Sequence, residues 1–159
     1  MIRSTPPGRR GNATESPALI RELYNALLEE LSAIVGYSYA DTLLEAELPF
    51  VAELFEEIGM DEMRHYHTLA ALLRDLGAPF TPRTVVLPAP QAPTGDATTD
   101  ARRILSASER DERGAHRSYL RLAAMASTPR VADTLRAIAA DEEEHAMAHA
   151  AMQHRLRDS

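Results

Sequence analysis

The feature that most constrains this chain is a short charged motif that occurs twice. Asp61-Glu62-Met63-Arg64-His65 is followed 80 residues later by Asp141-Glu142-Glu143-Glu144-His145. In a helix, Glu-x-x-His places a carboxylate and an imidazole one turn apart on the same face, where both can reach one ion. Two such pairs predict a site for two metal ions.

Each Glu-His pair interrupts a row of apolar residues at helical spacing. The upstream row is Val51, Phe55, Ile58, Glu62, His65, Leu69, Leu72 and Leu76, and the downstream row is Val131, Leu135, Ile138, Glu142, His145, His149, Met152 and Leu156. Steps of three and four residues place each row on one face of a helix. Because the rest of each face is apolar, we expect both Glu-His pairs to be buried in the core rather than solvated.

The composition narrows the class of protein. With 159 residues, of which 45% are hydrophobic and 26% charged, the chain is long enough for one globular domain with a sizeable core. It contains no cysteine, so a metal must be held by oxygen and nitrogen. The net charge of -7 argues against nucleic-acid binding, and no apolar run is long enough for a membrane span. We expect a cytoplasmic protein.

The order of breakers and caps predicts an all-α fold. Residues 1–16 are expected to form a disordered tail, and 17–157 the domain. Helices are expected to begin at Pro17 after Ser16, at Pro49, near a capping Asp100, and at Pro129 after a capping Thr128. Residues 77–99 contain five prolines and two glycines, which are typical of a long crossover. The prediction is a four-helix bundle of two hairpins joined by this crossover.

The first and third helices should each supply one more carboxylate. In the first helix, Glu30 shares its face with Leu23, Leu27, Ile34 and Tyr37, whereas Glu29 lies on a more polar face. We therefore select Glu30.

In the third helix, Glu109 and Glu112 lie near one face. The pattern Glu30-x-x-Ala33-x-x-x-Tyr37 recurs as Glu112-x-x-Ala115-x-x-x-Tyr119, which favours Glu112, with Glu109 as a further ligand if one is needed. Four buried carboxylates need neutralisation, which two divalent cations would provide. Carboxylate and imidazole ligands suit iron or manganese.

These motifs resemble those of the ferritin-like superfamily, and within it those of bacterioferritins and rubrerythrins. Glu30-Leu31-Ser32-Ala33-Ile34-x-x-Tyr37 is similar to the first-helix motif of bacterioferritin, and the segment 61–65 to its second-helix motif. The segment 141–145 resembles the last-helix motif of both families, and Glu109-x-x-Glu112 the glutamate pair in the third helix of rubrerythrin. The resemblance covers residues 17 to about 157.

The resemblance implies a ligand set and a reaction. Glu62 and Glu142 would bridge two metals, Glu30 and His65 would complete one of them, and Glu112 and His145 the other. The implied activity is that of a non-haem di-iron or dimanganese oxidoreductase, which uses O2 or hydrogen peroxide as a ferroxidase or peroxidase. A rubrerythrin-like peroxidase would need a separate electron donor, because no rubredoxin-type iron centre can form without cysteine.

Alternatives to this function stay open. A non-catalytic metal-binding protein and an iron store are two of them, and the Ile58-Gly59-x-x-Glu62 context is similar to manganese catalases, which disproportionate peroxide. Met63 occupies the place of the haem-ligating methionine of bacterioferritin, but we expect no haem. We expect a homo-oligomer, and specifically a dimer. A 24-subunit store is not expected, because little chain follows Glu142 to form the fifth helix of cage-forming ferritins.

Aromatic and histidine residues near the ligands have two interpretations. Tyr37 and Tyr119 either take part in electron transfer and hydrogen bonding at the metals or are core residues with a satisfied hydroxyl group. His116 and His149 are either extra ligands or hydrogen-bonded core histidines.

Overall fold

The computed structural model describes residues 15–78 and 92–158, and within these ranges the chain folds into four long helices. Their bounds are Pro17–Leu44 (α1), Pro49–Asp75 (α2), Ala97–Met125 (α3) and Pro129–Arg155 (α4). The predicted all-α fold is confirmed. The tail expected for 1–16 lies outside the described residues except for its last two, and the expected crossover 77–99 is described only at its two ends.

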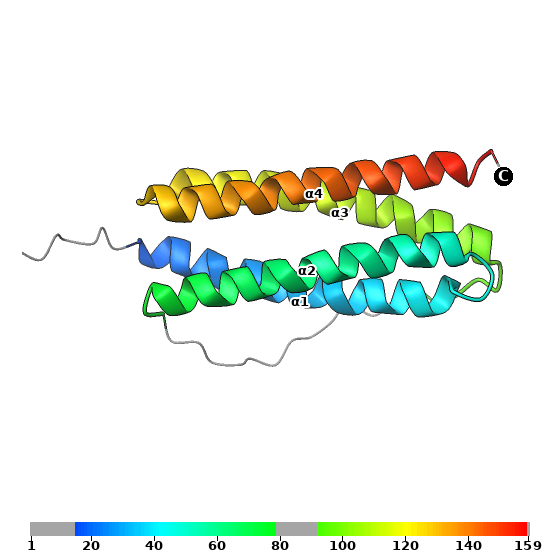
Figure 1. The fold of residues 1–159 in the computed structure, drawn as a ribbon, viewed down its shortest axis with the longest axis horizontal. Helices are drawn as coiled ribbons and strands as arrows, with labels where there is room; N and C mark the ends of the chain where they lie inside the picture. Colours follow the sequence, from blue (N-terminus) through cyan, green and yellow to red (C-terminus); the bar gives the residue numbers. More distant parts are fainter. Residues whose placement is uncertain (1–14, 79–91, 159) are drawn as a thin grey trace, which may run out of the picture.

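The helices form two antiparallel hairpins, α1 with α2 and α3 with α4, which lie against each other along their length (Figure 1). The end of α2 and the beginning of α3 lie at opposite ends of the bundle (Figure 1). α2 and α3 therefore run in the same direction, which requires a crossover rather than a short turn between them. No helix in the described ranges combines the length and the apolar character that crossing a membrane needs.

Helix starts follow local sequence signals, with one correction. The Ser16 side chain accepts a hydrogen bond from the Leu19 amide at 3.1 Å, with Pro17 at the first helical position. The third helix begins at Ala97 rather than at Asp100, because Asp96 accepts from the Thr99 amide at 2.6 Å and forms the cap.

The start of α4 is capped from a distance. Thr128 is the N-cap residue, as predicted, but its side chain does not make the capping hydrogen bond. The buried carboxylate of Glu15 instead accepts from the Ser127 amide at 2.7 Å and from the Thr128 amide and hydroxyl group at 3.0 and 2.9 Å. Glu15 thus joins the beginning of α1 to the beginning of α4.

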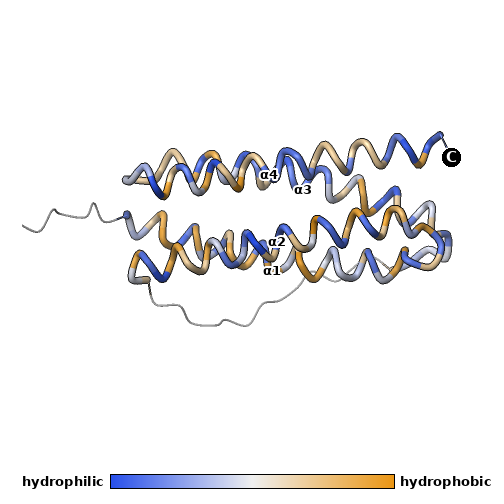
Figure 2. The backbone as a smooth tube through the Cα atoms, viewed as in Figure 1, coloured by the Kyte–Doolittle hydropathy of each residue, from blue (hydrophilic) through white to orange (hydrophobic). Residues whose placement is uncertain are grey.

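The apolar core is divided into two clusters. Figure 2 shows apolar and polar residues alternating along each helix, as expected for helices with one buried face. The first cluster includes Leu23, Leu69, Leu73, Leu122 and Leu135, and the second includes Leu44, Val51, Phe55, Ala101 and Leu105. Between the two clusters the inward faces of all four helices carry ionisable side chains, which together form the candidate site.

Candidate metal centre

The two Glu-His pairs meet across the interface between α2 and α4. Nδ1 of His65 on α2 lies 3.1 Å from Oε1 of Glu142 on α4, and Nδ1 of His145 on α4 lies 3.1 Å from Oε1 of Glu62 on α2. All four side chains are buried. The sequence repeat is therefore a structural one, in which each hairpin supplies half of the centre.

The other two helices add one buried carboxylate each, Glu30 from α1 and Glu112 from α3, which are called the outer carboxylates below. The six side chains make two overlapping groups whose ligand atoms lie within 4.8 Å of one another: Glu30, Glu62, His65 and Glu142, and Glu62, Glu112, Glu142 and His145. Glu62 and Glu142 belong to both groups. This is the arrangement that a two-ion site with two shared carboxylates would need.

The polar atoms of these side chains fit a pair of cations. Within the described ranges, Glu62 Oε1, Glu142 Oε1 and His145 Nδ1 are buried without a hydrogen-bond partner. His145 Nδ1 faces Glu62 Oε1 at 3.1 Å, but without the alignment of a hydrogen bond. Buried polar atoms without partners are rare in folded proteins because each costs free energy. An ion bound between them would remove that cost.

Burial acts strongly on the two outer carboxylates. Burial, together with contact with Glu62, raises the pKa of Glu30 to about 10. Burial and contact with Glu142 likewise raise the pKa of Glu112 to about 10. In the metal-free protein both groups are therefore protonated and neutral at pH 7.

Among the four inner groups, Glu62, Glu142, His65 and His145, the carboxyl and imidazole groups favour one another's charged forms. Burial opposes ionisation of Glu62 and Glu142, but the imidazole groups of His145 and His65 outweigh it and lower the pKa of each carboxyl group. Burial also opposes protonation of the histidines, yet the same carboxylates raise the pKa of His65 to about 11 and that of His145 to about 9. The metal-free centre thus holds two carboxylates beside two imidazolium groups, with no net charge.

A carboxylate on the opposite hairpin orients each histidine. His65 Nε2 lies 3.2 Å from Oδ2 of Asp141, and His145 Nε2 lies 3.3 Å from Oδ2 of Asp61. Such contacts fix the orientation of a ligating imidazole and leave Nδ1 directed at the metal position. This role was not predicted from the sequence, although the aspartate directly before each glutamate of the repeated motif was a usable signal.

The two tyrosines contact the outer carboxylates in a crossed arrangement. The hydroxyl group of Tyr37 on α1 donates to Glu112 on α3, and that of Tyr119 on α3 donates to Glu30 on α1. Burial and the neighbouring carboxylate raise the pKa of both tyrosines. Each tyrosine is thus a neutral hydrogen-bond donor that holds one ligand in place.

Three other candidate residues lie outside the site formed by these six side chains. Glu109 accepts hydrogen bonds from Arg113 at 3.0 Å and from Gln153 at 2.9 Å, and belongs to neither group. Glu29 is exposed. His116 is half-buried, and its Nδ1 lies 2.7 Å from the backbone carbonyl oxygen of Ala139, so it is a hydrogen-bonded histidine outside the site.

His149 is fully buried beside one half of the centre. Its Nε2 lies 3.4 Å from the Tyr37 hydroxyl oxygen and 3.9 Å from Oε1 of Glu112. Burial lowers its pKa to about 4, so the ring is neutral at pH 7. His149 is a neighbour of the ligands rather than a member of either group.

Comparisons with known proteins agree with this architecture. The chain is similar to the solved structure of the bacterioferritin-related protein from Bacteroides fragilis, described as a dodecameric thioferritin, with a TM-score of 0.71 and 21% identity over 91% of this chain and 92% of that one. No curated protein sequence gives a significant match. The family model named Ferritin, which describes a ferritin-like domain, matches residues 20–158. With that match over nearly the whole chain, and with four helices in the ferritin-like arrangement, the protein belongs to the Ferritin family.

Proposed function

We propose that this protein is a non-haem dinuclear iron or manganese oxidoreductase that acts on Fe(II) with O2 or hydrogen peroxide, in the manner of a ferroxidase or peroxidase. The observation that carries the proposal is the pair of overlapping four-residue groups that share Glu62 and Glu142. Structural sites need only hold one ion, whereas two adjacent ions with shared carboxylates suit reactions that move two electrons.

The residues have distinct roles in this proposal. Glu62 and Glu142 would contribute to both ion positions, Glu30 and His65 would complete one of them, and Glu112 and His145 would complete the other. When bound, the metal pair supplies redox chemistry toward O2 or peroxide. The chain supplies the rest of the environment: four carboxylates balance the charge of two divalent cations, and an apolar cluster packs on either side of the centre.

The outer contacts limit how far the ligands can move. Asp61 and Asp141 orient the two imidazole rings from the opposite hairpin. Tyr37 and Tyr119 each donate a hydrogen bond to one outer carboxylate. In this proposal the two tyrosines, being so close to a redox-active pair, also take part in electron transfer.

The test begins with metal content. Protein purified without added metal is analysed by mass spectrometry beside a Glu62→Ala/Glu142→Ala variant and a Glu109→Ala control, which removes a carboxylate outside both groups. About two iron or manganese ions per chain are expected in the wild type and the control, and none in the double variant. Unchanged metal content in the double variant would sink the assignment of the site.

Activity assays then separate the possible reactions. Oxidation of Fe(II) with consumption of O2 identifies a ferroxidase, peroxide consumption that needs an electron donor identifies a peroxidase, and O2 release from peroxide identifies a catalase-like reaction. Metal-loaded protein that does none of these is a non-catalytic metal-binding protein.

An iron store is the second candidate, because the similar Bacteroides fragilis protein is described as dodecameric. Light scattering after size-exclusion chromatography decides between the two sizes of assembly. A dodecamer that accumulates many iron ions per chain favours storage, whereas a dimer that holds two ions per chain favours the enzyme.

A further inference from the structure

A long groove separates α1 from α3 and leads to the candidate metal centre. Its volume is about 940 Å³. Its floor includes four of the carboxylates described above, Glu30, Glu62, Glu112 and Glu142. Among the described residues, the candidate metal centre is therefore open toward the α1/α3 face of the bundle.

Small side chains on both helices keep this groove open. Ala33, Gly36 and Ala40 line it from α1, and Ala107 and Gly114 line it from α3. A methyl group built on either glycine would meet no atom of the described structure within 4 Å. Helices normally fill such a seam with interlocking side chains. Here the side chains are too small to do so.

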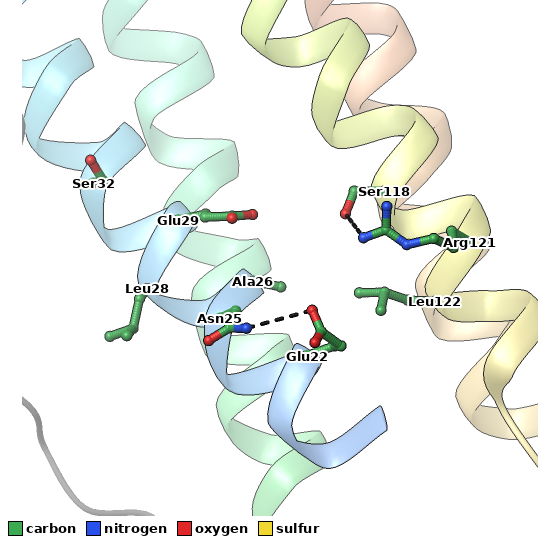
Figure 3. Close-up of a pocket in the computed structure, with 9 residues that line it drawn as sticks. All are labelled: Glu22, Asn25, Ala26, Leu28, Glu29, Ser32, Ser118, Arg121 and Leu122. Atoms are coloured by element: carbon green, nitrogen blue, oxygen red, sulfur yellow. Dashed lines mark hydrogen bonds between the residues drawn. The ribbon is translucent and has the colours of Figure 1, made fainter. Parts of the chain in front are cut away.

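The groove has a polar end and an apolar end. Toward the N-terminus of α1 it continues into a second hollow of about 390 Å³. In Figure 3, Glu22, Asn25 and Glu29 of α1 line one side of this hollow, and Ser118 and Arg121 of α3 line the other. Ions and water can enter through this polar end.

The opposite end of the groove, toward the C-terminus of α1, has more apolar side chains in its lining. Between the metal centre and the C-terminus of α1, the apolar lining residues are Ala33, Val35, Ala40 and Leu43 from α1 and Ile104 and Ala107 from α3. The span from Ala33 to Leu43 corresponds to roughly 15 Å of helix. Four charged residues line this end as well. Arg103, Arg110 and Asp111 are exposed, and the buried Asp100 lies 3.4 Å from Arg103.

The size of the groove exceeds what Fe(II), O2 or peroxide needs. A water-sized molecule occupies about 30 Å³, and a hydrated cation gains nothing from an apolar wall. A volume of about 940 Å³ lies in the range of sites that bind organic molecules, roughly 300–1,000 Å³. The apolar end therefore calls for a different occupant.

We propose that the groove binds an elongated organic acid, with its apolar chain between α1 and α3 and its carboxylate at the metal centre. The apolar side chains at one end fit the chain, and cations held by the four carboxylates and two histidines would attract the anionic oxygen of the head group. The inference rests on the proposed function, because the metals hold the head of the ligand. It extends that function by giving the class of ligand.

The probe is decanoate, with decan-1-ol as the same chain without a carboxylate, added to protein loaded with Co(II). Calorimetry measures affinity, and the visible spectrum of Co(II) reports whether the carboxylate reaches the metal. Decanoate is expected to bind one per chain and to change the spectrum. Decan-1-ol is expected to bind more weakly and to leave the spectrum unchanged.

The decisive variant is Gly36→Leu, which fills the groove. Leucine favours a helix more than glycine does, so the variant should fold, and Gly114→Leu fills the other wall. Each should weaken decanoate binding at least tenfold while cobalt content stays at two per chain. The matched control is Ser38→Leu, which adds the same side chain at an exposed α1 position outside the groove and should bind like the wild type.

Three results would overturn the inference: no decanoate binding to cobalt-loaded protein, equal binding in wild type and Gly36→Leu, or dissociation of an oligomer by Gly36→Leu without any decanoate binding. The last would mean that a second copy of the chain covers the groove. A protein that takes up no cobalt refutes the proposed function instead. In that case decan-1-ol binding to the metal-free protein and to Gly36→Leu still tests the apolar end of the groove.

Discussion

Tyr37 and His149 meet in the core from opposite hairpins, with the tyrosine hydroxyl oxygen 3.4 Å from His149 Nε2 and the ring centroids 5.7 Å apart. The position that corresponds to His149 in the first hairpin, 80 residues earlier, is Leu69. The centre is thus nearly symmetric in its six ligands but not in their surroundings. The half that contains Glu112 and His145 has a second imidazole beside it, that of His149, whereas the half that contains Glu30 and His65 has Leu69 at the matching position.

The first prediction concerns this asymmetry. His149→Leu should weaken one of two metal-binding steps by about tenfold, because residues that contact ligands affect metal affinity by roughly 10- to 100-fold. The other step and the final stoichiometry of two should not change. Stepwise titration with Mn(II) by calorimetry measures both constants.

Folding is not expected to confound that result. His149 Nδ1 is buried without a partner in the described structure, so replacing the ring by leucine should change the free energy of unfolding by no more than about 1 kcal/mol. The control is His116→Leu, which removes a histidine outside the ligand set. Identical titration curves for wild type and His149→Leu would show that the two halves are equivalent despite their surroundings.

The second prediction separates neutral from charged carboxyl groups in the metal-free protein. Glu30→Gln and Glu112→Gln replace groups that are already neutral at pH 7, so each should change the free energy of unfolding by no more than about 1 kcal/mol. Glu62→Gln removes a charge that balances buried imidazolium groups and should cost about 3–5 kcal/mol. Urea unfolding of chelator-treated protein measures all three, and equal losses would contradict the assigned protonation.

The third prediction is proton release on metal binding. At pH 7 the metal-free centre carries one proton on each of four groups, Glu30, Glu112, His65 and His145. Two divalent cations replace these four protons, so about four should be released per chain and the charge of the core is conserved. Because the pKa values lie near 9 to 11, metal affinity should rise with pH across the neutral range.

Calorimetry in buffers of different ionisation enthalpy counts the protons. Glu109→Gln serves as the control, since its carboxylate belongs to neither group and the count should stay the same. Release of fewer than two protons would mean that the metal-free centre is held by charge pairs other than those described.

Much of the fold and the site follows from local spacing in the sequence. Steps of three and four residues fix which face of a helix is buried, so Glu30 was separable from Glu29 and the four motif residues 62, 65, 142 and 145 were placed on inward faces. The recurrence of the Glu-x-x-Ala-x-x-x-Tyr pattern of the first helix in the third distinguished Glu112 from Glu109. The binding of metal by these residues stays a prediction.

Contacts between distant segments could not be read from spacing. Asp61 and Asp141 reach histidines on the other hairpin, and the groove depends on how far α1 and α3 stand apart. The cap of α4 is of the same kind. The threonine before Pro129 was the local signal for a cap. The hydrogen bonds of the Ser127 and Thr128 amides are instead accepted by Glu15, more than one hundred positions earlier in the chain.

The last prediction tests that long-range cap. Burial opposes ionisation of Glu15, but hydrogen bonds from Ser127 and Thr128 outweigh it and lower the pKa of the carboxyl group. A carboxyl group whose pKa is lower in the folded state stabilises the fold above its unfolded pKa of about 4.3, and this stabilisation is lost as the pH falls through the folded value. Glu15→Gln should therefore reduce the free energy of unfolding by about 1 kcal/mol at pH 7, as for the loss of a helix cap, and by progressively less below pH 4.

Urea unfolding at pH 7 and at pH 3 measures this difference. Glu143→Gln is the matched control, because it removes the same charge from an exposed position in the middle of α4 and should have little effect at either pH. A loss for Glu15→Gln that is as large at pH 3 as at pH 7 would show that Glu15 acts through packing and not through its charge. Such a result would also separate the cap from the favourable interaction of a negative charge with the N-terminus of α4.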